Sequence, residues 1–222
     1  MNTPTPQSPQ LVLDTGSPAV SLAVGRVGSA VLSRTLELRR SSEQLLACVA
    51  ELLAEIGVHV SDLGGITALA GPGSFTGLRV GLATAMGLHQ ALGVPARAVP
   101  TLPILARAAS ASLADGDQVI AVVDALRGEW MGQTFSLEGG EPQAVDSPSL
   151  RASEALASSG RPVVGFGLEP LRPEVGDRCI EAPPLAALAL NAEIPGPWDP
   201  GGLVEPIYFR PPATTPPKTP VG

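Results

Sequence analysis

Hydrophobic residues in the first quarter of the chain form short runs, separated by glycines and polar turns. The runs at 11–13, 19–24 and 29–38 have the length and spacing of strands, so they predict a three-stranded meander. From 42 to 56 the period changes, because leucine, valine and isoleucine recur every three or four residues. That spacing predicts one amphipathic helix, which Gly57 ends.

An apolar stretch at 65–70 predicts a fully buried strand, and a glycine-rich loop follows it. A helix is expected over 76–92, ended by Gly93 and Pro95, with a further strand at 96–99. Three strands, helix, strand, helix, strand is the order of the ribonuclease H-like unit. That unit occurs twice in the superfamily of actin, the sugar kinases and the Hsp70 ATPase, which is a hint about architecture only.

The pattern begins again, with weaker signals, after a helix over 101–112 and a polar turn at 114–117. The second series comprises strands at 119–124 and 129–137, a helix at 150–158, a strand at 163–166, a helix at 184–191 and an extended segment at 205–210. We therefore predict a mobile tail at 1–9, a first domain at 10–113, a second and leaner domain at 114–210, and a proline-rich tail at 211–222.

The glycine-rich loop is the most distinctive stretch of the chain. It consists of Gly71, Pro72, Gly73, Ser74, Phe75, Thr76, Gly77, Leu78 and Arg79. A glycine turn that feeds a helix N-terminus can hold an anion, but no Gly-Lys-Ser/Thr or GxGxxG pattern is present. The alternative is structural: the glycines permit a tight turn, Ser74 or Thr76 caps the helix, and Phe75 packs inward. The residues favour this alternative.

Small residues then recur every fourth position along the following helix, at Gly77, Gly81 and Ala85. Such a row lets another helix backbone approach closely. Leucines and methionines make most of the remaining surface apolar, so one side is expected to lie on the sheet and another against a partner.

Residues suited to catalysis are sparse. Asp14 ends a predicted strand at the point where actin-like kinases place a metal- and phosphate-binding carboxylate, and Asp124 stands at the matching point of the second half. Aspartate at a strand-to-turn junction is also an ordinary turn former. His59 and His89 lack metal-binding spacing and no GxSxG motif occurs, so neither a protein-held metal nor a serine nucleophile is expected.

The composition narrows the class of partner and compartment. The chain has 222 residues and a net charge of −7, which disfavours unaided binding to a nucleic acid. Two isolated cysteines, Cys48 and Cys179, fit a reducing compartment, and no signal peptide or membrane span is evident. These features predict a cytoplasmic protein that does not contact a membrane.

Several motifs together resemble the TsaB (YeaZ) family of tRNA threonylcarbamoyladenosine biosynthesis. The motifs are Leu13-Asp14-Thr15, the loop Gly71–Arg79 with Val80-Gly81, Val123-Asp124-Ala125 with Gly128-Glu129, and Glu205-Pro-Ile-Tyr208. The resemblance implies an α/β actin-like, Hsp70-ATPase-like (ASKHA) fold of two ribonuclease H-like halves, the second degenerate. One departure is Leu126, which shifts Arg127 by one place relative to the family's Asp-Ala-Arg.

The resemblance also implies a function without catalysis by this chain. Members pair with TsaD through the two first-domain helices, dock the ATPase TsaE, form homodimers alone, and meet tRNA only through the complex, which transfers a threonylcarbamoyl group to N6 of adenosine 37 in tRNAs reading ANN codons. ATP or ADP is expected only in the assembled complex. The interface residues expected here are Leu45, Val49, Leu52, Gly77, Leu78, Gly81, Leu82 and Ala85.

Two other functions remain open from the residues. One is an ATP-dependent small-molecule phosphotransferase of the actin-like superfamily that uses Asp14 and the glycine loop. The other is a metallopeptidase, which would need clustered histidines that the chain lacks.

Overall fold

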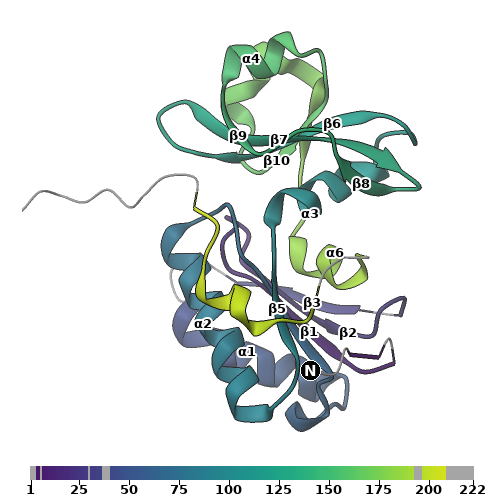
Figure 1. The fold of residues 1–222 in the computed structure, drawn as a ribbon, viewed down its shortest axis with the longest axis vertical. Coiled ribbons are helices and arrows are strands. Elements are labelled where there is room, and N and C mark those ends of the chain that lie inside the picture. Colours follow the sequence, from purple (N-terminus) through teal and green to yellow (C-terminus); the bar gives the residue numbers. More distant parts are fainter. Residues whose placement is uncertain (1–3, 6, 30, 37–40, 193–196, 209–222) are drawn as a thin grey trace, which may run out of the picture.

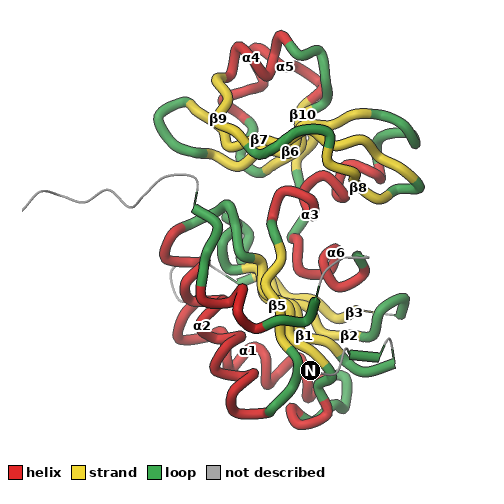
Figure 2. Tube along the Cα trace, viewed as in Figure 1, coloured by secondary structure: helices red, strands yellow, loops and turns green. Residues whose placement is uncertain are grey.

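The computed structural model describes residues 4–5, 7–29, 31–36, 41–192 and 197–208. They form a mixed α/β structure with two sheets, one in each half of an elongated molecule (Figure 1). Figure 2 shows that α1 and α2 lie on one face of the lower sheet and that α3 and α6 lie between the two sheets.

The first sheet has five strands in the order β3-β2-β1-β4-β5. Its strands are β1 Gln10–Asp14, β2 Ser21–Gly25, β3 Val31–Thr35, β4 Gly65–Leu69 and β5 Ala96–Val99. The predicted meander is confirmed, since β1 pairs antiparallel with β2 and β2 with β3. The parallel pairing of β1 with β4 requires a crossover, which α1 Ser41–Glu55 provides.

One face of this sheet is covered by α1 and by α2 Phe75–Leu92. Leucines on the inner sides of both helices pack against alternate residues of β1, such as Leu11 and Leu13, in one core cluster. The helix α2 ends as expected at Gly93, which adopts a left-handed conformation and donates its N–H to the His89 carbonyl. The predicted helix 76–92 is therefore confirmed to within one residue.

The second sheet repeats the same strand order, β8-β7-β6-β10-β11, and β9 is added to β7. Its strands are β6 Gln118–Asp124, β7 Glu129–Glu138, β8 Glu141–Ala144, β9 Ser149–Ala152, β10 Val163–Gly165 and β11 Cys179–Glu181. The helices α4 Ser153–Ser158 and α5 Arg172–Val175 are short. The interpretation of 114–117 as the start of a second series is thus supported by the order of the strands.

Each half contributes its last helix to the sheet of the other half. The helix α3 Thr101–Ala108 packs on β6, β7 and β8, whereas α6 Leu185–Asn191 packs on β1, β2 and β3, and the two helices contact each other. Their apolar side chains belong to one large core cluster that includes residues from both sheets. This shared core joins the halves.

The exchange corrects the domain boundaries expected from the sequence. Residues 101–111 were assigned to the first domain but cover the second sheet. Residues 185–208 were assigned to the second but return to the first, where a 3-10 helix, η6 Pro200–Val204, packs on α2 and β5. Sequence order cannot reveal this exchange, because an apolar helix face fits either sheet.

Several smaller expectations also need correction. The helix expected at 150–158 begins only at Ser153, because Leu150 pairs with Met131 in a strand. β8 and β11 were not predicted. The described part of the N-terminal tail contacts the first half, where Pro9 accepts a hydrogen bond from Gly64 N–H. The C-terminal tail, 211–222, lies outside the described residues.

Within the described residues, no helix is both long enough and apolar enough to cross a membrane.

Candidate functional site

The glycine-rich loop lies between β4 and α2, against the turn that follows β1. Ser74 caps α2 by accepting a hydrogen bond from Gly77 N–H at 3.3 Å, and its own N–H donates to the Gly16 carbonyl at 2.8 Å. The Thr15 hydroxyl donates to the Gly77 carbonyl at 2.7 Å. The structural interpretation of the loop is therefore well supported, because its polar groups mainly hold the β1–β2 turn.

The row of small residues on α2 faces this same turn. A Cβ atom at Gly77 would collide with the Thr15 carbonyl, and one at Gly81 would collide with the Thr15 hydroxyl. At Gly73 it would lie 2.7 Å from the Gly16 carbonyl oxygen. This row of small residues thus permits a close approach of the β1–β2 turn of the same chain, and not of a partner helix.

The residues expected at a partner interface lie in the interior. Each is buried apart from Gly77, which is half-buried, and the set is Leu45, Val49, Leu52, Gly77, Leu78, Gly81, Leu82 and Ala85. This assignment of individual side chains is corrected, because the sheet and the β1–β2 turn already cover them. That the two helices pair with a partner stays a prediction.

The outer sides of the same two helices carry a second set of small residues. On α1 these are Ala47, Ala50 and Ala54, and on α2 they are Ala83, Gly87 and Ala91, all exposed. Gly87 has open space where a Cβ would lie. We call these six residues the helical face. Sequence periodicity alone could not separate it from the buried row, because both rows have small residues at helical spacing.

Asp14 and Asp124 end corresponding strands but lie in different environments. Asp14 is fully buried, where Oδ1 accepts from Ser17 N–H at 3.1 Å and Oδ2 has no partner among the described residues. Its burial raises the pKa of its carboxyl group from 3.8 to about 6, against hydrogen bonds from Ser17 and Gly16 that lower it. Asp124 is exposed and accepts from Leu126 N–H at 2.7 Å.

A cleft of about 550 Å³ lies between the two halves. The loop, the β1–β2 turn and the end of β6 line it, together with Leu126 and Phe166. Asp124 is the charged residue of this lining, and neither lysine nor arginine is part of it. A triphosphate needs cations or many free N–H donors. A phosphate bound here would therefore depend on a metal ion or on backbone N–H groups of the loop for positive charge.

The turn between β6 and β7 has an unusual backbone. Leu126 and Arg127 both have positive φ, at 64° and 59°, followed by Gly128 at 75°. Leu126 is 69% exposed at the mouth of the cleft, and Arg127 is also exposed. The extra residue relative to the family pattern is thus accommodated in a left-handed turn, and Arg127 faces solvent.

Arg79 links the loop to the C-terminal segment. Its guanidinium lies over the Phe75 ring, 3.9 Å from the centroid, and its Nε donates to the Tyr208 hydroxyl at 2.9 Å. The Phe75 and Tyr208 rings stack at 4.9 Å. Phe75 is therefore half-buried against Tyr208. The sequence offered only the co-occurrence of two family motifs as a signal for this cluster.

Neither histidine lies in a metal-binding cluster of the described chain. His59 caps a short 3-10 helix, and His89 Nδ1 lies 2.7 Å from the Val94 carbonyl oxygen. No group of three or more histidine, cysteine, aspartate or glutamate side chains that could hold a metal occurs in the part of the chain that the structure describes.

Comparison with known proteins gives consistent matches over most of the chain. The model of the family described as TsaD, tRNA N6-adenosine threonylcarbamoyltransferase, matches residues 35–158. The tRNA threonylcarbamoyladenosine biosynthesis protein TsaB of Escherichia coli is 30% identical over 164 residues, which is 71% of each chain. An uncharacterized protein of Mycobacterium tuberculosis is 30% identical over 213 residues, or 93% of each chain.

Solved structures give the same result. YeaZ from Pseudomonas aeruginosa matches with a TM-score of 0.59 and 33% identity, and the match covers 67% of this chain and 68% of that chain.

Proposed function

The chain belongs to the TsaB (YeaZ) family, and on that basis we propose that it is a non-catalytic subunit of tRNA threonylcarbamoyladenosine synthesis. In this role it activates a TsaD-type transferase by pairing with it, and the pair docks a TsaE-type ATPase. The complex, and not this chain, holds the nucleotide and meets tRNA, in the cytoplasm.

The helical face is the observation that carries the proposal. Six small exposed residues on α1 and α2 form a surface that two helices of another subunit can approach closely. An exposed leucine, Leu46, lies beside the face on α1. The same surface would serve self-pairing when the partner is absent.

The repeated strand order supports the fold that this function uses. Each sheet has the order of a ribonuclease H-like unit, so we assign the chain to the actin-like (ASKHA) architecture with a reduced second half. The cleft between the units is where an active member of that superfamily would hold a nucleotide. Here its lining is mostly apolar and lacks a cation.

Substitution of Gly87 tests the pairing surface. Gly87→Arg places a long charged side chain in open space on the helical face, so the chain should stay folded while a helix pair can no longer close on it. We expect co-purification of the TsaD-type subunit to fall at least tenfold, and tRNA modification by the reconstituted complex to fall with it.

The matched control is Ala114→Arg, which adds the same side chain to an exposed loop that precedes β6 of the second sheet. It should leave both yields unchanged. Wild-type pairing and modification with Gly87→Arg would contradict the proposal.

A phosphotransferase is the second candidate, and the unpartnered Oδ2 of buried Asp14 is the observation in its favour. Calorimetric titration of the purified chain with ATP and Mg²⁺ separates the two. Micromolar binding that Asp14→Asn abolishes would favour the kinase, whereas the subunit proposal expects no heat of binding at millimolar ATP.

A further inference from the structure

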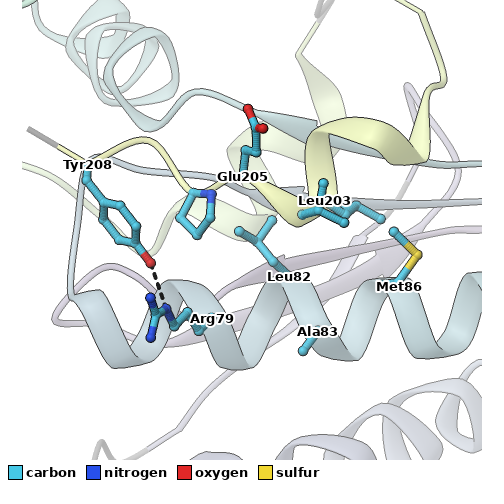
Figure 3. A pocket seen from close by; sticks show the side chains of 9 residues that line it. Arg79, Leu82, Ala83, Met86, Leu203, Glu205 and Tyr208 are labelled. Carbon is cyan, nitrogen blue, oxygen red and sulfur yellow. Dashed lines mark hydrogen bonds between the residues drawn. The ribbon is translucent and has the colours of Figure 1, made fainter. Parts of the chain in front are cut away.

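A groove of about 720 Å³ runs between α2 and the C-terminal segment 203–208 (Figure 3). Met86 lines its base, above the buried side chains of Leu82 and Leu203. Val204 stands on its rim and is 67% exposed, a large exposure for a valine beside an apolar base. Met86 and Val204 are therefore the large apolar side chains that the groove presents to an occupant.

One end of the groove presents a cation. Arg79 is exposed, and its contacts with Phe75 and Tyr208 engage the flat face of the guanidinium and Nε. No described residue accepts a hydrogen bond from its Nη atoms. A guanidinium held flat in this way can bind a carboxylate through two parallel hydrogen bonds.

Charge then constrains what the groove can accept. Figure 3 shows Arg79 and Tyr208 at one end, and Glu205 farther along the C-terminal segment with its carboxylate directed away from α2. A carboxylate is attracted at the Arg79 end, and the apolar side chains Met86 and Val204 lie farther along, so an occupant with one acid followed by apolar side chains fits in a single direction.

The groove also adjoins the helical face. Ala83 belongs to both, since it is exposed on α2 and lines the groove. A subunit lying on α1 and α2 would therefore extend directly over the groove.

From the apolar lining, the exposed guanidinium of Arg79 and this continuity, we propose that the groove binds an acidic and apolar segment of the subunit that pairs through the helical face. Its carboxylate binds Arg79 and its apolar side chains pack on Met86 and Val204. The inference rests on the proposed pairing function and adds a second contact to it.

The test measures the affinity of the full-length chain for the TsaD-type subunit of the same organism. We expect Arg79→Glu to raise Kd at least tenfold, Arg79→Lys to raise it less because lysine cannot make the paired hydrogen bonds, and Val204→Glu to raise it at least threefold. The wild-type complex should weaken with added salt more steeply than the Arg79→Glu complex.

Arg79 also supports Tyr208, so thermal unfolding of each variant must accompany the binding data. Val204→Glu alters an exposed side chain outside the Arg79 cluster and keeps the test valid if Arg79→Glu unfolds the segment. A photo-crosslinker at position 204 should attach to a peptide of the partner that has an acid near apolar residues.

Two results would overturn the inference. One is an unchanged Kd for both Arg79→Glu and Val204→Glu while Gly87→Arg still prevents pairing, which leaves the proposed function intact. The other is a crosslink from position 204 to a second copy of this chain in the presence of the partner. If the Gly87→Arg variant also pairs normally with the TsaD-type subunit, that result contradicts the proposed function itself and not only the inference about the groove.

Discussion

The two halves have the same strand order but very different helices. In the first half α1 has 15 residues and α2 has 18, whereas in the second half α4 has six and α5 has four. The short pair suffices to close a small core around Trp130 and Leu156. The long pair buries its inner side equally well and still presents an extended outer surface, so a partner surface is expected in the first half.

The halves also differ at their paired carboxylates. Asp14 is sealed beneath the β1–β2 turn, whereas Asp124 is exposed above the cleft. Corresponding positions in a repeated fold therefore have opposite environments, because the glycine loop covers one strand end and a short left-handed turn leaves the other open.

The largest expected effect concerns the buried row of small residues in the first half. Gly81→Leu forces a side chain into Thr15, and we expect a loss of about 3 kcal/mol or more in the free energy of unfolding. Urea denaturation measures it. Gly87→Ala, on the same helix in open space, should instead add about 0.5–1 kcal/mol. Equal effects at the two positions would contradict the assignment of buried and exposed rows.

The next effect contrasts the two aspartates. Between pH 3.8 and about 6 the folded chain keeps a proton on Asp14 that the unfolded chain releases, so stability falls as pH rises through this window. Asp14→Asn should remove that loss and raise stability at pH 7 by about 3 kcal/mol, with little difference at pH 3.5. Asp124→Asn, which weakens one exposed turn hydrogen bond, should cost about 0.5–1 kcal/mol.

Denaturation series from pH 3.5 to 7 test this prediction. A gain from Asp14→Asn that is the same at every pH would show that the pKa of Asp14 does not change on unfolding, which would contradict the prediction.

The smallest effect concerns the turn of the second half. Arg127 holds a left-handed conformation that glycine adopts without strain, so Arg127→Gly should stabilise the chain by up to about 1 kcal/mol. Thermal unfolding measures the gain. A lower melting temperature for Arg127→Gly would mean that the arginine side chain holds the turn.

Much of the local structure could be predicted from the residues. The meander, α1, α2 and the strands β6 and β7 follow from the change between strand and helix periods, and Gly93 ends α2 where the pattern places it. β8, β9 and β11 escaped prediction because they are short, exposed or rich in polar residues, and their stability comes from pairing with β7 and β10.

The candidate site was predicted in part. The glycine loop and its helix cap could be predicted from the sequence, whereas the rotation of α2 about its own axis could not. Small residues on α2 occur both in the row at Gly81 and in the row at Gly87, and composition does not say which row meets the turn after β1. The interface residues expected from the sequence lie in the buried row for this reason.

The sequence by itself determined the family, the repeated order of elements and the loop that launches α2, because these depend on local periods and short motifs. Only the tertiary structure decided which face of α2 is open, that α3 and α6 exchange sheets, and that segment 203–208 returns to form the groove. These features depend on contacts between residues far apart in the chain. Apolar surfaces of similar composition could pack on either sheet, so local sequence does not decide between them.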